Sequence, residues 1–215
     1  TSASFGAAKR LTGVNAADGE NTPSISADGM TLIYTWGEPP VHPSGLDRDI
    51  HRAIRMGSNY QFGSGEQLPF NQDNIEDDYS FLAANGDVWF GSKRAGDSVV
   101  SIYKATAVGG GQFGTVSYAG NLNSTSTANT YPVLTDNFLH IFFQRDGMVY
   151  VASRGNPDAA FGTPATVDDI NTDPACVGTN CRPAWVSPDA CRFYIGAGSA
   201  GGAVSMYVTA KPANP

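Results

Sequence analysis

Four polar residues occupy matching places in a repeated sequence pattern, each just before a short β-prone segment. They are Asn21, Asp77, Asn129 and Asn180. Carboxylate and amide oxygens are the ligands that a hard cation such as Ca²⁺ takes in proteins, so one interpretation of this set is a cation site. The alternative is that these side chains satisfy backbone groups where a loop enters a strand.

Carboxylates at and beside these positions raise the question of catalysis. A glycoside hydrolase needs two carboxylates roughly 5–9.5 Å apart. The candidates are Glu20, Glu76, Asp77 and Asp78. The sequence has neither a Gly-x-Ser-x-Gly elbow nor an HExxH motif, and His42, His51 and His140 show no partner pattern. Nucleophilic and zinc-hydrolase chemistry is therefore poorly supported, and a glycan-active hydrolase or lyase is the alternative to a binding module.

A second group of residues combines planar and charged side chains. Tyr79 and Tyr131 begin two of the β-prone segments, Arg182 precedes a third, and the remaining members come from loops: Trp36, Arg94 and Arg145. Aromatic faces beside hydrogen-bonding groups are what a sugar or a peptide needs. With the four polar residues above, they form the predicted ligand site. The alternative is that the two loop arginines pair with acidic neighbours and Trp36 packs under its own Pro-rich loop.

The three cysteines all fall in the last quarter of the chain. Cys176 and Cys181 flank a short Gly-containing loop that could close on itself as a disulfide, which favours an oxidising, exported setting, and Cys191 is left over. A zinc site is the competing interpretation, but there is no CxxC pair and no nearby His.

The elements that must position these residues form a repeat. Four Phe-Gly dipeptides, each ahead of the same downstream pattern, recur at intervals of roughly 50 residues, a spacing typical of propeller blades. These four begin at Phe5, Phe62, Phe113 and Phe161. Each blade contains a β-prone run ended by a turn pair such as Asp28-Gly29 or Asn85-Gly86, then a nearly continuous apolar run, then an aliphatic-aromatic pair, then the Phe-Gly segment.

The order of these segments predicts an all-β, closed four-bladed β-propeller with four antiparallel strands per blade. We expect one domain over 1–215, with blades at approximately 23–68, 79–118, 131–167 and 183–209. The strand at 5–11 has no strands of its own blade before it, and we expect it to complete the last blade, which removes exposed sheet edges. The long loops then lie on one face, which is the predicted binding surface.

The turns Ser26-Ala-Asp-Gly29 and Ser187-Pro-Asp-Ala190 resemble the Ser-Pro-Asp-Gly signature of the TolB-type, WD-like propeller repeats of bacterial exported proteins. The resemblance implies the propeller fold rather than an activity. Rings of that family mostly hold six or seven blades, so the four repeats either form a ring of their own or belong to a larger one.

Composition narrows the choice of partners. The formal net charge is −7, which disfavours nucleic acid, and no apolar run approaches the roughly 20 residues of a membrane span. We therefore expect a secreted, periplasmic or cell-surface module that recognises a carbohydrate or a protein. Ca²⁺ or another cation on the axis is the cofactor that the polar residues suggest.

Overall fold

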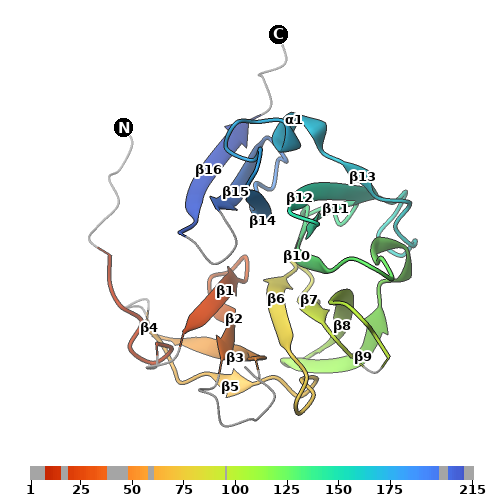
Figure 1. Cartoon of the computed structure of the whole chain (residues 1–215). Coiled ribbons are helices and arrows are strands. Elements are labelled where there is room, and N and C mark those ends of the chain that lie inside the picture. Colours follow the sequence, from red (N-terminus) through yellow and green to blue (C-terminus); the bar gives the residue numbers. More distant parts are fainter. Residues whose placement is uncertain are drawn as a thin grey trace.

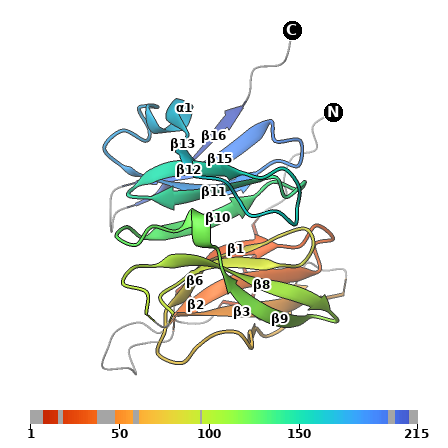
Figure 2. The same ribbon diagram turned by 90° about the vertical axis from the view of Figure 1, so that its right-hand side faces the viewer.

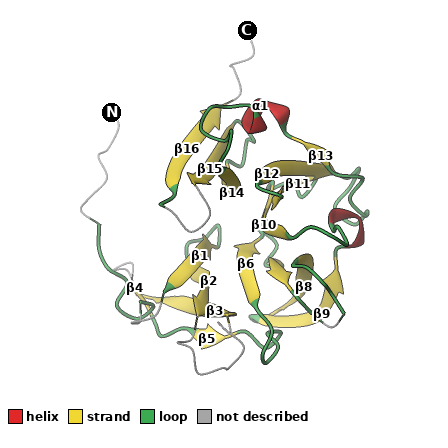
Figure 3. Cartoon of the chain, in the orientation of Figure 1, coloured by secondary structure: helices red, strands yellow, loops and turns green. Residues whose placement is uncertain are grey.

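The computed structural model describes residues 8–15, 19–37, 48–57, 61–94, 96–198 and 203–210. Apart from one helical turn and one 3₁₀ turn, its regular elements are strands, grouped in four antiparallel sheets around a common axis (Figure 1). Figure 2 shows the same sheets from the side, and Figure 3 shows how little helix the chain contains. The predicted four-bladed propeller is confirmed.

Each sheet is one blade, and its strands follow the chain from the axis outward. Blade one comprises β1 (Glu20–Ile25), β2 (Thr31–Gly37) and β3 (Arg48–Met56), with β4 (Gln61–Phe62) and β5 (Glu66–Gln67) both paired to β3. Blade two comprises β6 (Asp77–Leu82), β7 (Val88–Ser92), β8 (Ser101–Gly109) and β9 (Gln112–Tyr118). Blade three comprises β10 (Asn129–Leu134), β11 (His140–Arg145), β12 (Met148–Ser153) and β13 (Ala165–Thr166). Blade four comprises β14 (Asn180–Val186), β15 (Arg192–Gly198) and β16 (Ser205–Ala210). The helical pieces η1 (Gly120–Leu122) and α1 (Asp168–Asn171) precede β10 and β14.

The turn after each innermost strand explains why short polar sequences separate the apolar runs. In blade one the Ser26 hydroxyl donates to Asp28 Oδ1 at 2.6 Å, and the same oxygen accepts the Met30 N–H at 2.9 Å. Gly29 follows with a φ of 69°, a left-handed conformation that glycine adopts without strain. Ser187 and Asp189 make the equivalent contacts in blade four.

Buried apolar side chains lie between consecutive blades. Ile33 and Ile50 of blade one meet Val88 and Phe90 of blade two, and similar clusters join blade two to three and blade three to four. Because both faces of the middle strands are covered in this way, those strands are nearly all apolar. Within the described residues, no buried apolar cluster joins blade four to blade one.

A repeated asparagine fastens a loop to the third strand of its blade. Asn71 accepts from the Ile50 N–H at 3.1 Å and donates to the Ile50 carbonyl at 2.8 Å. Asn123 does the same to Ile102, and Asn171 to Val149. These asparagines secure the loops that lead back to the axis.

The last blade differs from the prediction in its outer strand. Of the predicted closing strand at 5–11, residues 5–7 lie outside the described residues, and residues 8–11 are not in a strand. Leu11 and Val14 pack instead against the cluster of Leu32, Tyr34 and Phe62 in blade one. The described part of blade four therefore has three strands, and its last strand, β16, is exposed along its length. No helix in the described residues is long and apolar enough to cross a membrane.

Candidate functional site

A β-bulge interrupts the innermost strand of every blade. In β6 the register with β7 shifts between Asp78 and Phe81, and the corresponding shifts fall in β1, β10 and β14. In three blades the first bulge residue has a left-handed backbone: φ is 45° at Thr22, 57° at Tyr79 and 52° at Tyr131. A bulky residue rarely adopts this conformation, and it occurs mainly where the surrounding structure requires it, often at functional sites.

The bulges surround a cavity of about 670 Å³ on the propeller axis. All four innermost strands contribute to its wall, and its residues include Asn21, Arg48, Tyr79, Ser80, Tyr131 and Arg182. Tyr79, Tyr131 and Arg182 also line a second hollow of about 460 Å³, together with the loop before β10 and the turn between β11 and β12. These three side chains therefore lie where the axial cavity meets the long-loop face, which is the face that carries the loop before β10 and the turn between β11 and β12.

The two tyrosines contact each other in the cavity. Their ring centroids are 4.5 Å apart with the planes tilted by 56°, and the Arg182 guanidinium lies 5.4 Å from the Tyr131 centroid. Burial raises the pKa of both phenols, so both remain protonated hydrogen-bonding groups at neutral pH. The result is an aromatic surface beside a cation.

Arg48 brings the second charge into the cavity. Its guanidinium lies 2.6 Å from Asp78 Oδ2 and 3.4 Å from Glu76 Oε1. Burial and the neighbouring Asp78 carboxylate raise the pKa of Glu76. Two of the predicted catalytic carboxylates are thus held by one arginine behind the cavity wall.

Asp77 has a structural role in this arrangement. Its carboxylate is fully buried and accepts from Arg94 Nη2 at 2.9 Å and from the Gln72 N–H at 3.0 Å. Arg94 also donates to the Phe70 carbonyl and lies over the rings of Phe90 and Tyr103. Burial still raises the pKa of Asp77, against the opposing effect of Ser92 and Arg94.

In blade three the corresponding contact joins an arginine to a neutral residue, Asn129, at the start of the innermost strand. Arg145 Nε donates to Asn129 Oδ1 at 2.8 Å, and its Nη2 donates to the Leu122 carbonyl at 2.7 Å. The guanidinium stacks over Phe143 and Tyr150. Arg94 and Arg145, both predicted as ligand-binding, are placed inside their blades rather than on the cavity wall.

The structure does not bring the four proposed cation ligands together. Asn21 lines the cavity, whereas Asp77 and Asn129 are buried on arginines, and Asn180 lies against Gly147. Alignment on the bulges also shows that Glu20, not Asn21, corresponds to Asp77. The one-residue offset moves the side chain to the other side of the strand.

Trp36 and Glu20 also lie apart from the cavity wall. Trp36 packs beside the blade-one cluster, with His51 edge-on at 5.0 Å between ring centroids. Glu20 pairs with Trp36 in the register of β1 and β2. Of the predicted ligand residues, Asn21, Tyr79, Tyr131 and Arg182 share the axial cavity.

Sequence reasoning missed Arg48 and Ser80. Arg48 begins β3 outside the innermost strands, so nothing in the repeat pattern marks it as an axial residue. Ser80 comes directly after Tyr79, at the position that proline holds in blades one, three and four, and that departure from the repeat was an available signal.

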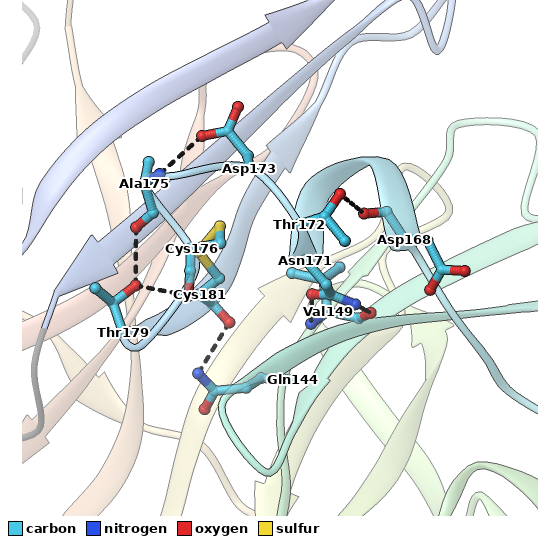
Figure 4. Close-up of a disulfide and its surroundings, with 10 residues drawn as sticks. All are labelled: Gln144, Val149, Asp168, Asn171, Thr172, Asp173, Ala175, Cys176, Thr179 and Cys181. Carbon is cyan, nitrogen blue, oxygen red and sulfur yellow. Dashed lines mark hydrogen bonds between the residues drawn. A yellow bond between two sulfur atoms is a disulfide. The ribbon is translucent and has the colours of Figure 1, made fainter.

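The predicted disulfide between Cys176 and Cys181 is formed, with the two Cα atoms 5.4 Å apart (Figure 4). It closes the loop that leads from α1 into β14, and Gln144 of blade three donates to the Cys181 carbonyl at 2.9 Å. Cys191 is an exposed free thiol.

No family model matches the sequence, and no curated protein matches it either. Solved structures share the fold. A putative TolB from Agrobacterium tumefaciens is 14% identical with a TM-score of 0.56, and the match covers 91% of this chain and 59% of that one. A Hadza microbial sialidase (11%, TM-score 0.51) and a puromycin hydrolase (12%, TM-score 0.51) match 88% and 87% of this chain and 44% and 26% of their own. The chain thus spans less than two thirds of each of these proteins, and the likeness shows a TolB-like propeller fold.

Proposed function

We propose that this propeller is an exported ligand-binding module whose site is the axial cavity at the long-loop face, and that its ligand is a carbohydrate. The observation that supports this most directly is the pair of tyrosines held in left-handed backbone at the cavity wall. A carbohydrate presents both C–H faces and hydroxyl groups, and this wall offers aromatic rings beside polar side chains.

The cost of the backbone conformation strengthens the proposal. A non-glycine residue in this region costs on the order of 1–3 kcal/mol, and the bulge imposes it at Thr22, Tyr79 and Tyr131. Glycine would remove the cost at each position. The presence of tyrosine at two of the three positions is therefore better explained by a role in the cavity than by a requirement of the bulge.

A glycan-active enzyme is the competing proposal, and the positions of the carboxylates favour a binder. Asp77 is buried on Arg94, and Asp78 is held by Arg48. Among the described residues, no Asp or Glu lines the axial cavity. Burial and Asp78 raise the pKa of Glu76, but Glu76 is not on the described cavity wall, and no pair of carboxylates lies there for glycoside hydrolysis.

Export is proposed from the disulfide. A bridge between residues 176 and 181 requires an oxidising compartment to persist. A protein partner is the second candidate ligand, and the exposed apolar side chains of Met206 and Val208 on β16 are the observation that favours it.

The test is a glycan array followed by calorimetric titration of the glycans that bind. We expect Tyr79→Leu with Tyr131→Leu to lose at least tenfold in affinity, because both rings leave the wall. Tyr118→Leu, on the exposed outer strand of blade two, is the matched control and should bind normally.

Three outcomes would count against this assignment. An array without hits would reject carbohydrate. Unchanged affinity in the double variant would reject the cavity. Release of shortened products from a bound glycan would replace the binder with the enzyme.

A further inference from the structure

The axial cavity has a charge opposite to that of the protein. The chain carries a formal net charge of −7. Yet the charged residues on the described wall of the cavity are Arg48 and Arg182, and no described carboxylate faces it. An acidic protein that presents only cations to its central cavity is suited to an anionic ligand.

The two arginines differ in whether the protein neutralises them. Arg48 is paired with Asp78 and lies within 3.4 Å of Glu76. Arg182 has no ion pair among the described residues and is held over the Tyr131 ring instead. Its guanidinium is therefore the group in the cavity whose charge is available to a ligand.

Ser80 supplies a second, independent indication of a ligand. It lines the cavity, the residue is only 7% exposed, and its hydroxyl oxygen has no hydrogen-bond partner among the described groups. A buried hydroxyl without a partner is uncommon, because burial without a hydrogen bond costs free energy. A ligand hydroxyl or carboxylate that contacts the cavity wall would satisfy it.

We infer that the cavity binds an acidic sugar of the uronic-acid type, with its carboxylate on Arg182 and its ring against Tyr79 and Tyr131. The inference rests on the proposed function and specifies its ligand class. One unpaired guanidinium matches one carboxylate, which it can bind through two parallel N–H···O hydrogen bonds. The sugar hydroxyls then meet Ser80 and the neighbouring polar wall.

The experiment compares matched saccharides by calorimetric titration. The probes are oligogalacturonates, glucuronate-containing oligosaccharides and their methyl esters, which keep the sugar and lose the charge. We expect the acids to bind at least tenfold tighter than the esters, and the difference to shrink as salt rises.

Variants of Arg182 test which residue is responsible. Arg182→Gln should abolish the preference for the acid, while Arg182→Lys should retain part of it, because lysine keeps the charge without the bidentate geometry. Arg192→Gln removes the same charge from an exposed position on β15 and should leave the preference intact. Ser80→Ala should weaken binding severalfold without changing the preference.

The outcomes separate this inference from the proposed function. Equal binding of acid and ester, or an unchanged preference in Arg182→Gln, overturns the acidic class while carbohydrate binding survives. Binding of neutral glycans but not of acidic ones would also overturn the acidic class while carbohydrate binding survives. If no saccharide binds but peptides with acidic termini do, both proposals fail and the cavity is a peptide site.

Discussion

Blades two and three hold the loop before their innermost strand in one way, and blade four holds it in another. In blade two Arg94 joins the Phe70 carbonyl to the buried Asp77, and in blade three Arg145 joins the Leu122 carbonyl to Asn129. In blade four the disulfide between Cys176 and Cys181 closes the corresponding loop. The loop before the innermost strand is therefore held by an arginine in blades two and three and by a covalent bond in blade four.

The comparison also separates two kinds of arginine. Arg94 and Arg145 stack inside their blades, whereas Arg48 and Arg182 line the axial cavity. The first kind should determine stability. Of the second kind, Arg48 is paired with the buried Asp78, so Arg182 is the arginine that should determine binding. Substitutions of these arginines and of the disulfide cysteines test this division.

Removing Arg94 should be the most damaging of these changes. Arg94→Ala leaves the Asp77 carboxylate buried without its cation, which costs about 3–5 kcal/mol of unfolding free energy. Chemical denaturation measures the loss.

The loss in Arg94→Ala should also depend on pH. Burial already raises the pKa of Asp77 in the folded state, and loss of Arg94 raises it further. A folded-state pKa above the unfolded value means that the folded state binds the proton more tightly, so stability falls as pH rises through that range. The deficit should therefore be smaller at pH 5 than at pH 8, and a deficit that grows on acidification would contradict the ion-pair role.

Opening the disulfide should have the next largest effect. Replacing Cys176 and Cys181 with alanine frees a short loop, for which chain entropy predicts a loss of about 2 kcal/mol. Thermal unfolding under non-reducing conditions gives the shift. Cys191→Ala is the control, since that exposed thiol closes no loop, and an equal shift in the control would indicate that the bridge contributes nothing.

Arg145→Ala should cost less than Arg94→Ala. Its side-chain partner, Asn129, is neutral, so truncation leaves an unsatisfied amide rather than a buried charge, at about 1–2 kcal/mol. The loss should be nearly independent of pH between 5 and 8. If the two arginine variants lose equal stability, the charge of Asp77 does not set the difference between blades two and three.

Arg182→Gln should change stability least. Arg182 lies on the cavity wall without an ion pair among the described residues. We therefore expect the free energy of unfolding of the variant to stay within about 0.5 kcal/mol of that of the parent protein. The same variant should lose ligand affinity. A large loss of stability would place Arg182 with the arginines that hold the blades.

Much of the fold could be predicted because each blade repeats local signals. The turn residues around Asp28 and Asp189 fix where the innermost strands end, and the apolar runs around Val88 and Ile141 mark strands covered on both faces. The site was harder to predict because it depends on the direction in which each side chain points, and not only on the residue's position in the repeat. Asp77 and Tyr79 are two residues apart, yet one is buried on Arg94 and the other faces the axis.

The sequence by itself determined the four blades, the order of the three inner strands of each and the cysteine pair, since these follow from local periodicity, turn chemistry and spacing. It did not determine the outer strand of blade four, because the predicted strand at 5–11 is not a strand over residues 8–11. Tertiary structure alone decided which polar residues share the cavity. The β-bulges shift the register by one residue and turn Tyr79 and Tyr131 toward the axis, whereas Asp77 and Asn129 are each buried on an arginine of their own blade. Which of the bulge residues share one cavity is decided only when four sheets pack around one axis, so the sequence of a single blade carries no signal for it.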